Sequence, residues 1–172
     1  MNTEKTMAKN ILIAALGLVV VLGSWFAYVY FSDKEVIKRQ LFGLAAEIGK
    51  DGQEPPVKMA LKMGHIKNMA DRRCMVIIPE RGYEEALESD LIIQSIIYYR
   101  NRFALLAVTL DKMIILVSAK DNAEVQVTVT AQHQYSAQAD PVKKVHKVGL
   151  TLIKSDKKWL IRKILIPAGL LG

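Results

Sequence analysis

His133 and Tyr135 are the side chains whose type and spacing most suggest chemistry, because they interrupt an apolar face of a predicted strand. From residue 125 the sequence alternates apolar and polar residues, which is the pattern of a half-buried strand. The histidine and the tyrosine take the next two positions on the apolar face. An imidazole and a phenol there could line a small-ligand pocket or hold a metal. Alternatively, they mark where the core ends, since amphipathic rings are common at such edges.

The following strand supplies candidate partners for these two residues. Apolar side chains are odd-numbered in the first strand and even-numbered in the second, so the numbers of facing residues must add up to an odd value. We expect the register in which His133 faces His146 and Tyr135 faces Lys144. A shift by two residues would leave the histidines as diagonal neighbours. With Tyr98 from a preceding helix, the candidate pocket rim consists of Tyr98, His133, Tyr135, Lys144 and His146.

The same residues argue against several kinds of catalytic centre. Two facing histidines supply two metal ligands, whereas a catalytic zinc site uses three, and His65 is remote in the sequence. No HExxH pattern, phosphate-binding glycine loop or nucleophile with a plausible base is present. We therefore expect no catalytic residues, no metal site and no cofactor, which leaves a small-ligand pocket as the candidate functional site.

An uncharged segment near the N-terminus predicts a membrane anchor. Ile11–Phe31 contains 21 residues, and at about 1.5 Å per residue a helix of this length matches a hydrocarbon core of about 30 Å. A cleaved signal peptide would have a shorter apolar region and small residues at its cleavage site, where this chain has Leu22 and Trp25. We predict a short tail, a transmembrane helix and one domain, over residues 1–10, 11–31 and 32–172.

The charges around this segment bear on its orientation. Lys5 and Lys9 favour a cytoplasmic N-terminus, whereas Lys34, Lys38 and Arg39 oppose it. Long domains translocate largely regardless of charge, so we favour an N-in arrangement. This predicts a single-pass protein of the inner membrane with its domain in the periplasm or otherwise outside the cytoplasm.

Three amphipathic helices are expected next, together with one short strand. A capping box at Ser32 and Glu35 predicts the start of the first helix. Prolines open the second helix, and Ser89 is expected to cap the third. The helices are predicted over about residues 32–49, 55–70 and 89–103, with a buried strand at Cys74–Ile78.

From residue 105 the hydrophobic period changes from helical to two, which predicts an antiparallel meander. Short polar links separate four strand-like runs. In the last run the apolar positions change parity near Arg162 and Lys163, which predicts a β-bulge. The runs are Leu105–Ser118, Glu124–Tyr135, Val142–Lys154 and Lys158–Ile166.

This order of elements, ending in the tryptophan strand "KSDKKWLIRKILI", resembles the cone-shaped α+β superfamily named after nuclear transport factor 2. The resemblance covers Lys34–Pro167 and implies a curved, mainly antiparallel sheet around three helices, with a pocket that members use for catalysis or for small ligands. Ketosteroid isomerase of this superfamily uses an aspartate base, and no acidic residue lies on the predicted inner faces of the last three strands. A membrane-anchored form is similar to the bitopic subunit of bacterial type IV secretion systems.

Charge and surface patterns indicate possible partners. The net charge of +7 lies entirely in residues 141–172, where it could attract anionic lipid headgroups or protect a sheet edge against pairing. Aromatic residues do not alternate with these lysines, so we expect no nucleic-acid binding. Uncharged polar residues on the outer face of one strand predict a homodimer contact; they are Gln126, Thr128, Thr130, Gln132 and Gln134.

These patterns together predict a single-pass, membrane-anchored binding or assembly module without catalytic activity. Its expected partners are the lipid bilayer through Ile11–Phe31, a second copy of the chain and other proteins of a membrane complex. Two alternatives remain open, namely a subunit of a type IV secretion machine and a small-molecule enzyme of the ketosteroid isomerase-like type.

Overall fold

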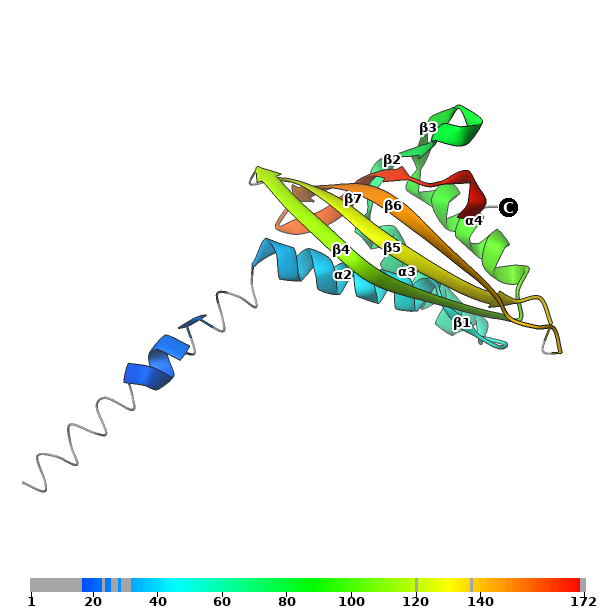
Figure 1. Cartoon of the computed structure of the whole chain (residues 1–172), viewed down its shortest axis with the longest axis horizontal. Coiled ribbons are helices and arrows are strands. Elements are labelled where there is room, and N and C mark those ends of the chain that lie inside the picture. Colours follow the sequence, from blue (N-terminus) through cyan, green and yellow to red (C-terminus); the bar gives the residue numbers. More distant parts are fainter. Residues whose placement is uncertain are drawn as a thin grey trace, which may run out of the picture. The chain divides into compact units, whose positions relative to one another are not determined.

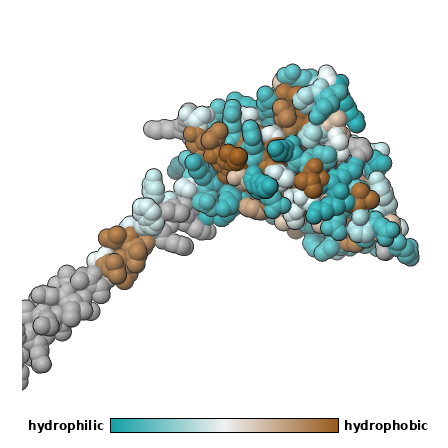
Figure 2. Space-filling view, viewed as in Figure 1, coloured by the Kyte–Doolittle hydropathy of each residue, from teal (hydrophilic) through white to brown (hydrophobic). Residues whose placement is uncertain are grey.

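The computed structural model describes residues 17–22, 24–25, 28, 32–119, 121–136 and 138–170. The chain divides into two compact units, Met1–Val36 and Ile37–Gly172. Much of the predicted transmembrane segment, Ile11–Phe31, lies outside the described residues. Residues 17–22 are exposed and mostly apolar (Figure 2). Within the described ranges, no helix has both the length and the apolar character needed to cross a bilayer.

Three amphipathic α-helices follow, as predicted (Figure 1). The Ser32 hydroxyl accepts a hydrogen bond from the Glu35 backbone N–H at 3.4 Å, so Ser32 caps the first helix as expected. The second helix ends one residue earlier than predicted, because Ala70 is extended and begins a strand. The helices are α2 (Asp33–Ile48), α3 (Pro56–Met69) and α4 (Ser89–Asn101).

One seven-stranded sheet carries the rest of the domain, in the order β1-β4-β5-β6-β7-β2-β3. All neighbouring strands are antiparallel except β2 and β7. The predicted meander of four long strands is confirmed, and Figure 1 shows these strands curving beside the helices. The strands are β1 (Lys50–Asp51), β2 (Ala70–Ile78), β3 (Tyr83–Glu88), β4 (Leu105–Ala119), β5 (Asn122–Gln134), β6 (Val142–Ser155) and β7 (Lys158–Leu165).

Two of these strands were not expected. β1 lies in a segment whose sequence indicates a loop, and it pairs with only the first two residues of β4. β3 lies before α4 and pairs along its whole length with β2. The single turn of 3-10 helix η1 (Pro79–Arg81) connects β2 to β3. Gly82 follows this turn with a φ of 59°, a left-handed conformation that suits glycine.

The bulge predicted in the last strand is confirmed. Thr151 pairs with Lys163 and Leu152 pairs with Ile161, so Arg162 has no opposite residue in β6. The pairing of β4 with β5 contains two unpredicted irregularities, one after Val117 and one after Asp111, where the φ of Lys112 is 46°.

The predicted register between β5 and β6 is wrong by four residues. His133 pairs with Val142 instead of His146, and Lys144 pairs with Ala131 instead of the expected tyrosine. The parity of the register is as expected, so His133, Lys144 and His146 remain on the inner face. The two histidines are therefore not opposite one another.

The physical reason for this difference lies at the other end of the hairpin. Ala123 is fully buried and pairs with Leu152, which is also fully buried. The expected register placed Leu152 opposite Val127, which is two inward-facing positions further along β5 than Ala123. Parity determines which face a side chain occupies, but a shift by an even number of residues preserves the parity.

The core lies between the helices and the inner face of the sheet. Trp159 on β7 is 1% exposed, and its carbonyl oxygen accepts a hydrogen bond from the Gln40 side-chain amide of α2 at 2.6 Å. Cys74 on β2 is fully buried, and burial raises the pKa of its thiol to about 11. The thiol therefore stays protonated near neutral pH and acts as a small apolar core residue.

Candidate functional site: a cavity between α4 and the sheet

A cavity of about 520 Å³ lies between helix α4 and the inner face of the sheet. Side chains from α4 and from strands β2 to β7 line it. Volumes of this order are typical of pockets that bind small molecules. Protein interiors normally leave few voids larger than a water molecule, so a space of this volume between the helix and the sheet departs from close packing.

Aliphatic side chains form most of the cavity wall. The stripe of α4 that the sequence predicts to face inward does so, since Ile92, Ile96, Tyr99 and Phe103 all line the cavity. The inner face of the sheet contributes further apolar residues from β2, from β4 and from the end of β7. They include Val76, Ile78, Leu106, Val108, Ile164 and Ile166.

An aromatic cluster forms the wall where α4 ends beside β5. The ring centroids of Phe103 and His133 are 4.4 Å apart, and Tyr135 lies 5.2 Å from Phe103 and 5.4 Å from His133. His133 is only 6% exposed, whereas Tyr135 is 57% exposed. The histidine thus belongs to the buried wall, and the tyrosine is where the wall meets solvent.

His133 is neutral near pH 7. Burial lowers the pKa of its imidazole, and the positive charge of Lys144 lowers it further. A neutral imidazole has one N–H donor and one acceptor nitrogen. His133 can therefore donate a hydrogen bond to a bound molecule, or accept a bond or a proton from it.

The structure brings together three of the five candidate rim residues. His133, Tyr135 and Lys144 line the cavity, whereas Tyr98 and His146 are not among the described residues that do. Tyr98 is 65% exposed, and its neighbour Tyr99 faces the cavity instead. Adjacent helical residues point about 100° apart, so helical spacing had to separate these two tyrosines.

His146 lies against the C-terminal segment rather than in the cavity. A Cβ atom on Gly169, in the 3-10 turn η2 (Ala168–Leu170), would lie 2.8 Å from Cε1 of His146. A side chain at this position would force the His146 ring to move. Within the part of the chain that the structure describes, no three His, Cys, Asp or Glu side chains are grouped so that they could hold a metal ion.

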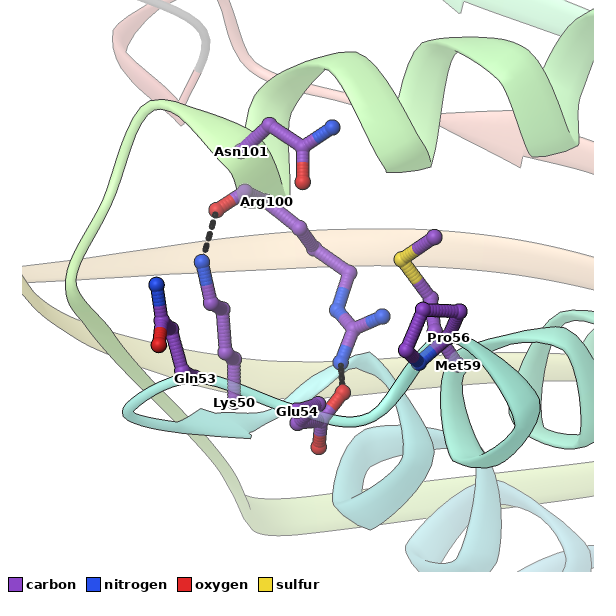
Figure 3. A pocket seen from close by; sticks show the side chains of 7 residues that line it. All are labelled: Lys50, Gln53, Glu54, Pro56, Met59, Arg100 and Asn101. Atoms are coloured by element: carbon purple, nitrogen blue, oxygen red, sulfur yellow. Dashed lines mark hydrogen bonds and ion pairs between the residues drawn. The ribbon is translucent and has the colours of Figure 1, made fainter.

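A buried ionic network supports the end of α4 and was not predicted. The Arg100 side chain is 2% exposed, and its Nη2 donates to Glu54 Oε2 at 2.6 Å (Figure 3). Its Nε donates to the carbonyl oxygen of Ile48 at 2.9 Å, and Nη2 also reaches that of Gly49 at 3.0 Å. Arg100 follows Ile96 by four residues on the inward stripe, so a charge at that position was the signal of a buried partner.

Two lysines complete the network. Lys62 donates to the Glu54 carboxylate and to the Gly49 carbonyl, and Lys50 donates to the Phe103 carbonyl at 2.9 Å. Burial alone raises the pKa of Glu54, but hydrogen bonds from Lys62 and Arg100 outweigh it and hold the pKa below its usual value. The network satisfies carbonyl groups at the C-terminal ends of α2 and α4, and it therefore fixes the helix that forms one wall of the cavity.

A second, smaller cavity of about 230 Å³ lies beside this network. Lys50, Glu54 and Arg100 line it and are hydrogen-bonded as described above (Figure 3). Because these charged groups satisfy one another and the ends of the helices, we assign them a structural role. Arg100 borders both cavities.

Comparison with solved structures identifies the fold. A proposed scytalone dehydratase from Novosphingobium aromaticivorans superimposes with a TM-score of 0.62 at 14% identity, covering 77% of this chain and 81% of that one. A protein from Kribbella flavida gives a TM-score of 0.66 at 9% identity, covering 79% and 90%. A proposed dehydratase of the nuclear transport factor 2-like family from Streptomyces avermitilis gives 0.62 at 9% identity, covering 79% and 95%.

At the level of sequence, no family model matches the chain, and no curated protein is significantly similar to it. At these identities the structural similarity establishes the fold alone. The described domain has the nuclear transport factor 2-like fold, as the order of its elements predicts.

Proposed function

We propose that the chain is a membrane-anchored module whose domain binds a small molecule in the cavity between α4 and the sheet. The observation that carries this proposal is the cavity itself, with an aliphatic body and the polar groups of His133, Tyr135 and Lys144 at one end. A concave apolar site with a few convergent polar groups is the usual form of a small-molecule site. A bound molecule would gain by removing this apolar wall from water.

The anchor in this proposal rests on the uncharged segment Ile11–Phe31. The expected location is the inner membrane, with the domain outside the cytoplasm. Anchoring also suits a role within a larger membrane complex, including one similar to a type IV secretion machine, and this role stays a prediction.

Filling the cavity tests the binding function. Ala131 lines the cavity and is half-buried, so Ala131→Phe places an aromatic ring in the empty volume. The probe is 4-phenylbutanol, an uncharged compound with an apolar body and one hydroxyl group. We expect its affinity to fall by about tenfold or more. The free energy of unfolding should rise by about 0.5–2 kcal/mol because empty volume is filled. Ligand-observed NMR measures the affinity, and urea denaturation measures the stability.

The matched control for this test is Thr130→Phe, which adds a ring at the adjacent position on the outer face of β5. It should leave the affinity unchanged. Equal binding by the parent chain and the Ala131→Phe variant, or no binding by the parent chain, would contradict the proposal.

An enzyme is the second candidate, and the neutral His133 beside Tyr135 favours it. Some proteins of the same fold are described as dehydratases, and removal of water needs a group that accepts a proton. Among the described residues that line the cavity none is a carboxylate, so an aspartate base of the ketosteroid isomerase type has no counterpart there. Turnover of an added hydroxylated aromatic compound that is lost in His133→Gln would favour this candidate over simple binding.

We also propose that the domain forms a homodimer through the outer face of β5. Ile114 of β4 pairs with Gln126 of β5 and is 57% exposed, so this face offers an apolar side chain beside uncharged polar ones. Confinement to a membrane would raise the effective concentration of a weak contact. Thr128→Lys with Thr130→Lys should therefore convert the dimer to a monomer, because it places like charges across the contact.

Light scattering coupled to size-exclusion chromatography gives the mass of the complex. Asn68→Lys with Gln94→Lys, which adds the same charge at exposed positions of α3 and α4, is the control and should remain dimeric. A parent chain that is monomeric at high concentration, or a threonine variant that still dimerises, would show that this surface is not the contact.

A further inference from the structure

The two ends of the cavity differ in chemistry. Around the first half of α4, the wall is mostly aliphatic and uncharged, with the hydroxyl groups of Tyr83 and Ser95 as its polar atoms. Its aliphatic residues are Val76, Ile78, Leu87, Ile92, Ile96, Ile164 and Ile166. Around the last turn of α4, the wall contains Arg102, Phe103, His133, Tyr135 and Lys144. At 1.5 Å per residue, Ile92 and the last residue of α4, Asn101, are separated by about 14 Å along the helix, and Phe103 follows two residues later. The cavity therefore extends along α4 and carries its charged groups at one end.

The charge at the polar end is positive. Arg100 is committed to Glu54 and to the carbonyl groups at the end of α2. Arg102 and Lys144 add two further positive charges, and the described lining residues include no Asp or Glu. The charge of Lys144 also lowers the pKa of His133, which shows that it acts on the wall of the cavity. A bound cation would be repelled at this end, whereas an anion would be attracted.

Aliphatic burial and positive charge together define the complementary molecule. Its apolar body gains from the loss of water along the aliphatic wall. Its anionic group gains charge-assisted hydrogen bonds from an ammonium or a guanidinium group, which are stronger than those between neutral groups. The neutral imidazole of His133 can donate one more hydrogen bond without adding a charge.

We propose that the cavity binds an anionic amphiphile, a monocarboxylate whose apolar body lies along the first half of α4 and whose carboxylate lies between Arg102 and Lys144. This inference rests on the proposed binding function and specifies the class of its ligand. The carboxylate could belong to an acyl chain released from the bilayer or to an aromatic acid from solution, and the two sources share this chemistry.

Ligands with the same apolar body and different charge test the inference. We would titrate the purified full chain with 4-phenylbutyrate, 4-phenylbutanol and 4-phenylbutylammonium, using the same preparation without protein as the blank. We expect the carboxylate to bind about tenfold more tightly than the alcohol, and the ammonium compound to bind more weakly than either. Octanoate in the same series distinguishes the two sources of the carboxylate. If octanoate binds more tightly than 4-phenylbutyrate, the ligand is an acyl chain. If octanoate binds more weakly, the ligand is an aromatic acid.

Charge-removing variants then locate the effect. Arg102→Gln with Lys144→Gln should abolish the preference for the carboxylate, measured as the ratio of its affinity to that of the alcohol. Binding of the alcohol by this variant shows that the cavity is intact. The matched control is Lys143→Gln with Lys147→Gln, which removes two charges from exposed positions of β6 and should retain the preference. If the double variant also loses the alcohol, the single variant Arg102→Gln at its exposed position decides, and it must weaken carboxylate binding by about threefold or more.

The outcomes separate this inference from the proposed function. If the alcohol binds and the carboxylate binds no more tightly, the ligand class is wrong while the binding function stands. The ligand class is also wrong if the Arg102 and Lys144 variants keep the preference, or if the control variant loses it. If none of the compounds binds, the binding function fails and this inference fails with it.

Discussion

Replacing Arg100 by alanine should lower the free energy of unfolding by about 3–5 kcal/mol, which is a large part of the stability of a domain of this size. The substitution leaves the Glu54 carboxylate, whose side chain is 6% exposed, without the guanidinium 2.6 Å away. It also removes the donor to the carbonyl group of Ile48 and one of the two donors to that of Gly49, which Lys62 still reaches. A buried charge that loses such a partner costs far more than the loss of an exposed ion pair.

Urea denaturation of the variant and the parent chain measures this effect. Arg102→Ala is the matched control, because Arg102 is an exposed arginine at the end of the same helix, and its stability effect should stay within about 0.5 kcal/mol. Replacing both partners, as in Arg100→Met with Glu54→Met, should recover much of the loss, since the buried carboxylate that lacks its guanidinium is removed as well. An Arg100→Ala variant as stable as the control would show that the network contributes nothing.

Acid provides an independent measurement on the same network. Because the folded-state pKa of Glu54 lies below its usual value, the stabilisation by its carboxylate is fully present above the unfolded-state pKa of about 4.3. It is lost as the pH falls through the lower, folded-state pKa. The stability advantage of the parent chain over Glu54→Gln should therefore shrink as the pH falls below about 5.

Local periodicity was sufficient for most elements of the fold, because helices and long strands bury one face along their whole length. Strand β3 shows where it fails. Glu84, Glu85 and Glu88 leave no regular apolar alternation, and the strand exists because it pairs with β2 at the edge of the sheet. That pairing is a tertiary contact, which no pattern within Tyr83–Glu88 encodes.

For the candidate site, the sequence predicted which face each side chain occupies but not which residues pair across the sheet. Alternation placed His133, Tyr135 and Lys144 on the inner face, and the structure brings all three to the cavity. The expected pairing of His133 with His146 failed because parity cannot detect a shift by four residues. Arg100 interrupts the apolar stripe of α4 and so signals a buried partner, but Glu54 lies 46 residues away in a connecting segment, beyond the reach of any helical or strand period.

Deleting Ile11–Phe31 should move the chain completely from the membrane fraction to the soluble fraction. A segment of 21 uncharged, mainly apolar residues is long enough to span the hydrocarbon core, and each transferred apolar side chain contributes to holding it there. The domain that remains has its own core, centred on buried residues such as Trp159 and Leu152. Extraction of membranes with alkaline carbonate separates integral from peripheral proteins and measures the change.

Two further variants are the controls for this deletion, one before the apolar segment and one within it. Deleting residues 1–10, which removes Lys5 and Lys9 but keeps the apolar segment, should leave the chain resistant to carbonate. Placing arginine at both Val20 and Val21, near the centre of the segment, should weaken retention because each charge there costs about 2.5–3.5 kcal/mol.

A reporter active only in the periplasm, fused after Gly172, should be active if the N-terminus is cytoplasmic. Release of the intact chain by carbonate would refute the anchor, whereas an inactive periplasmic reporter on a retained chain would refute only the orientation.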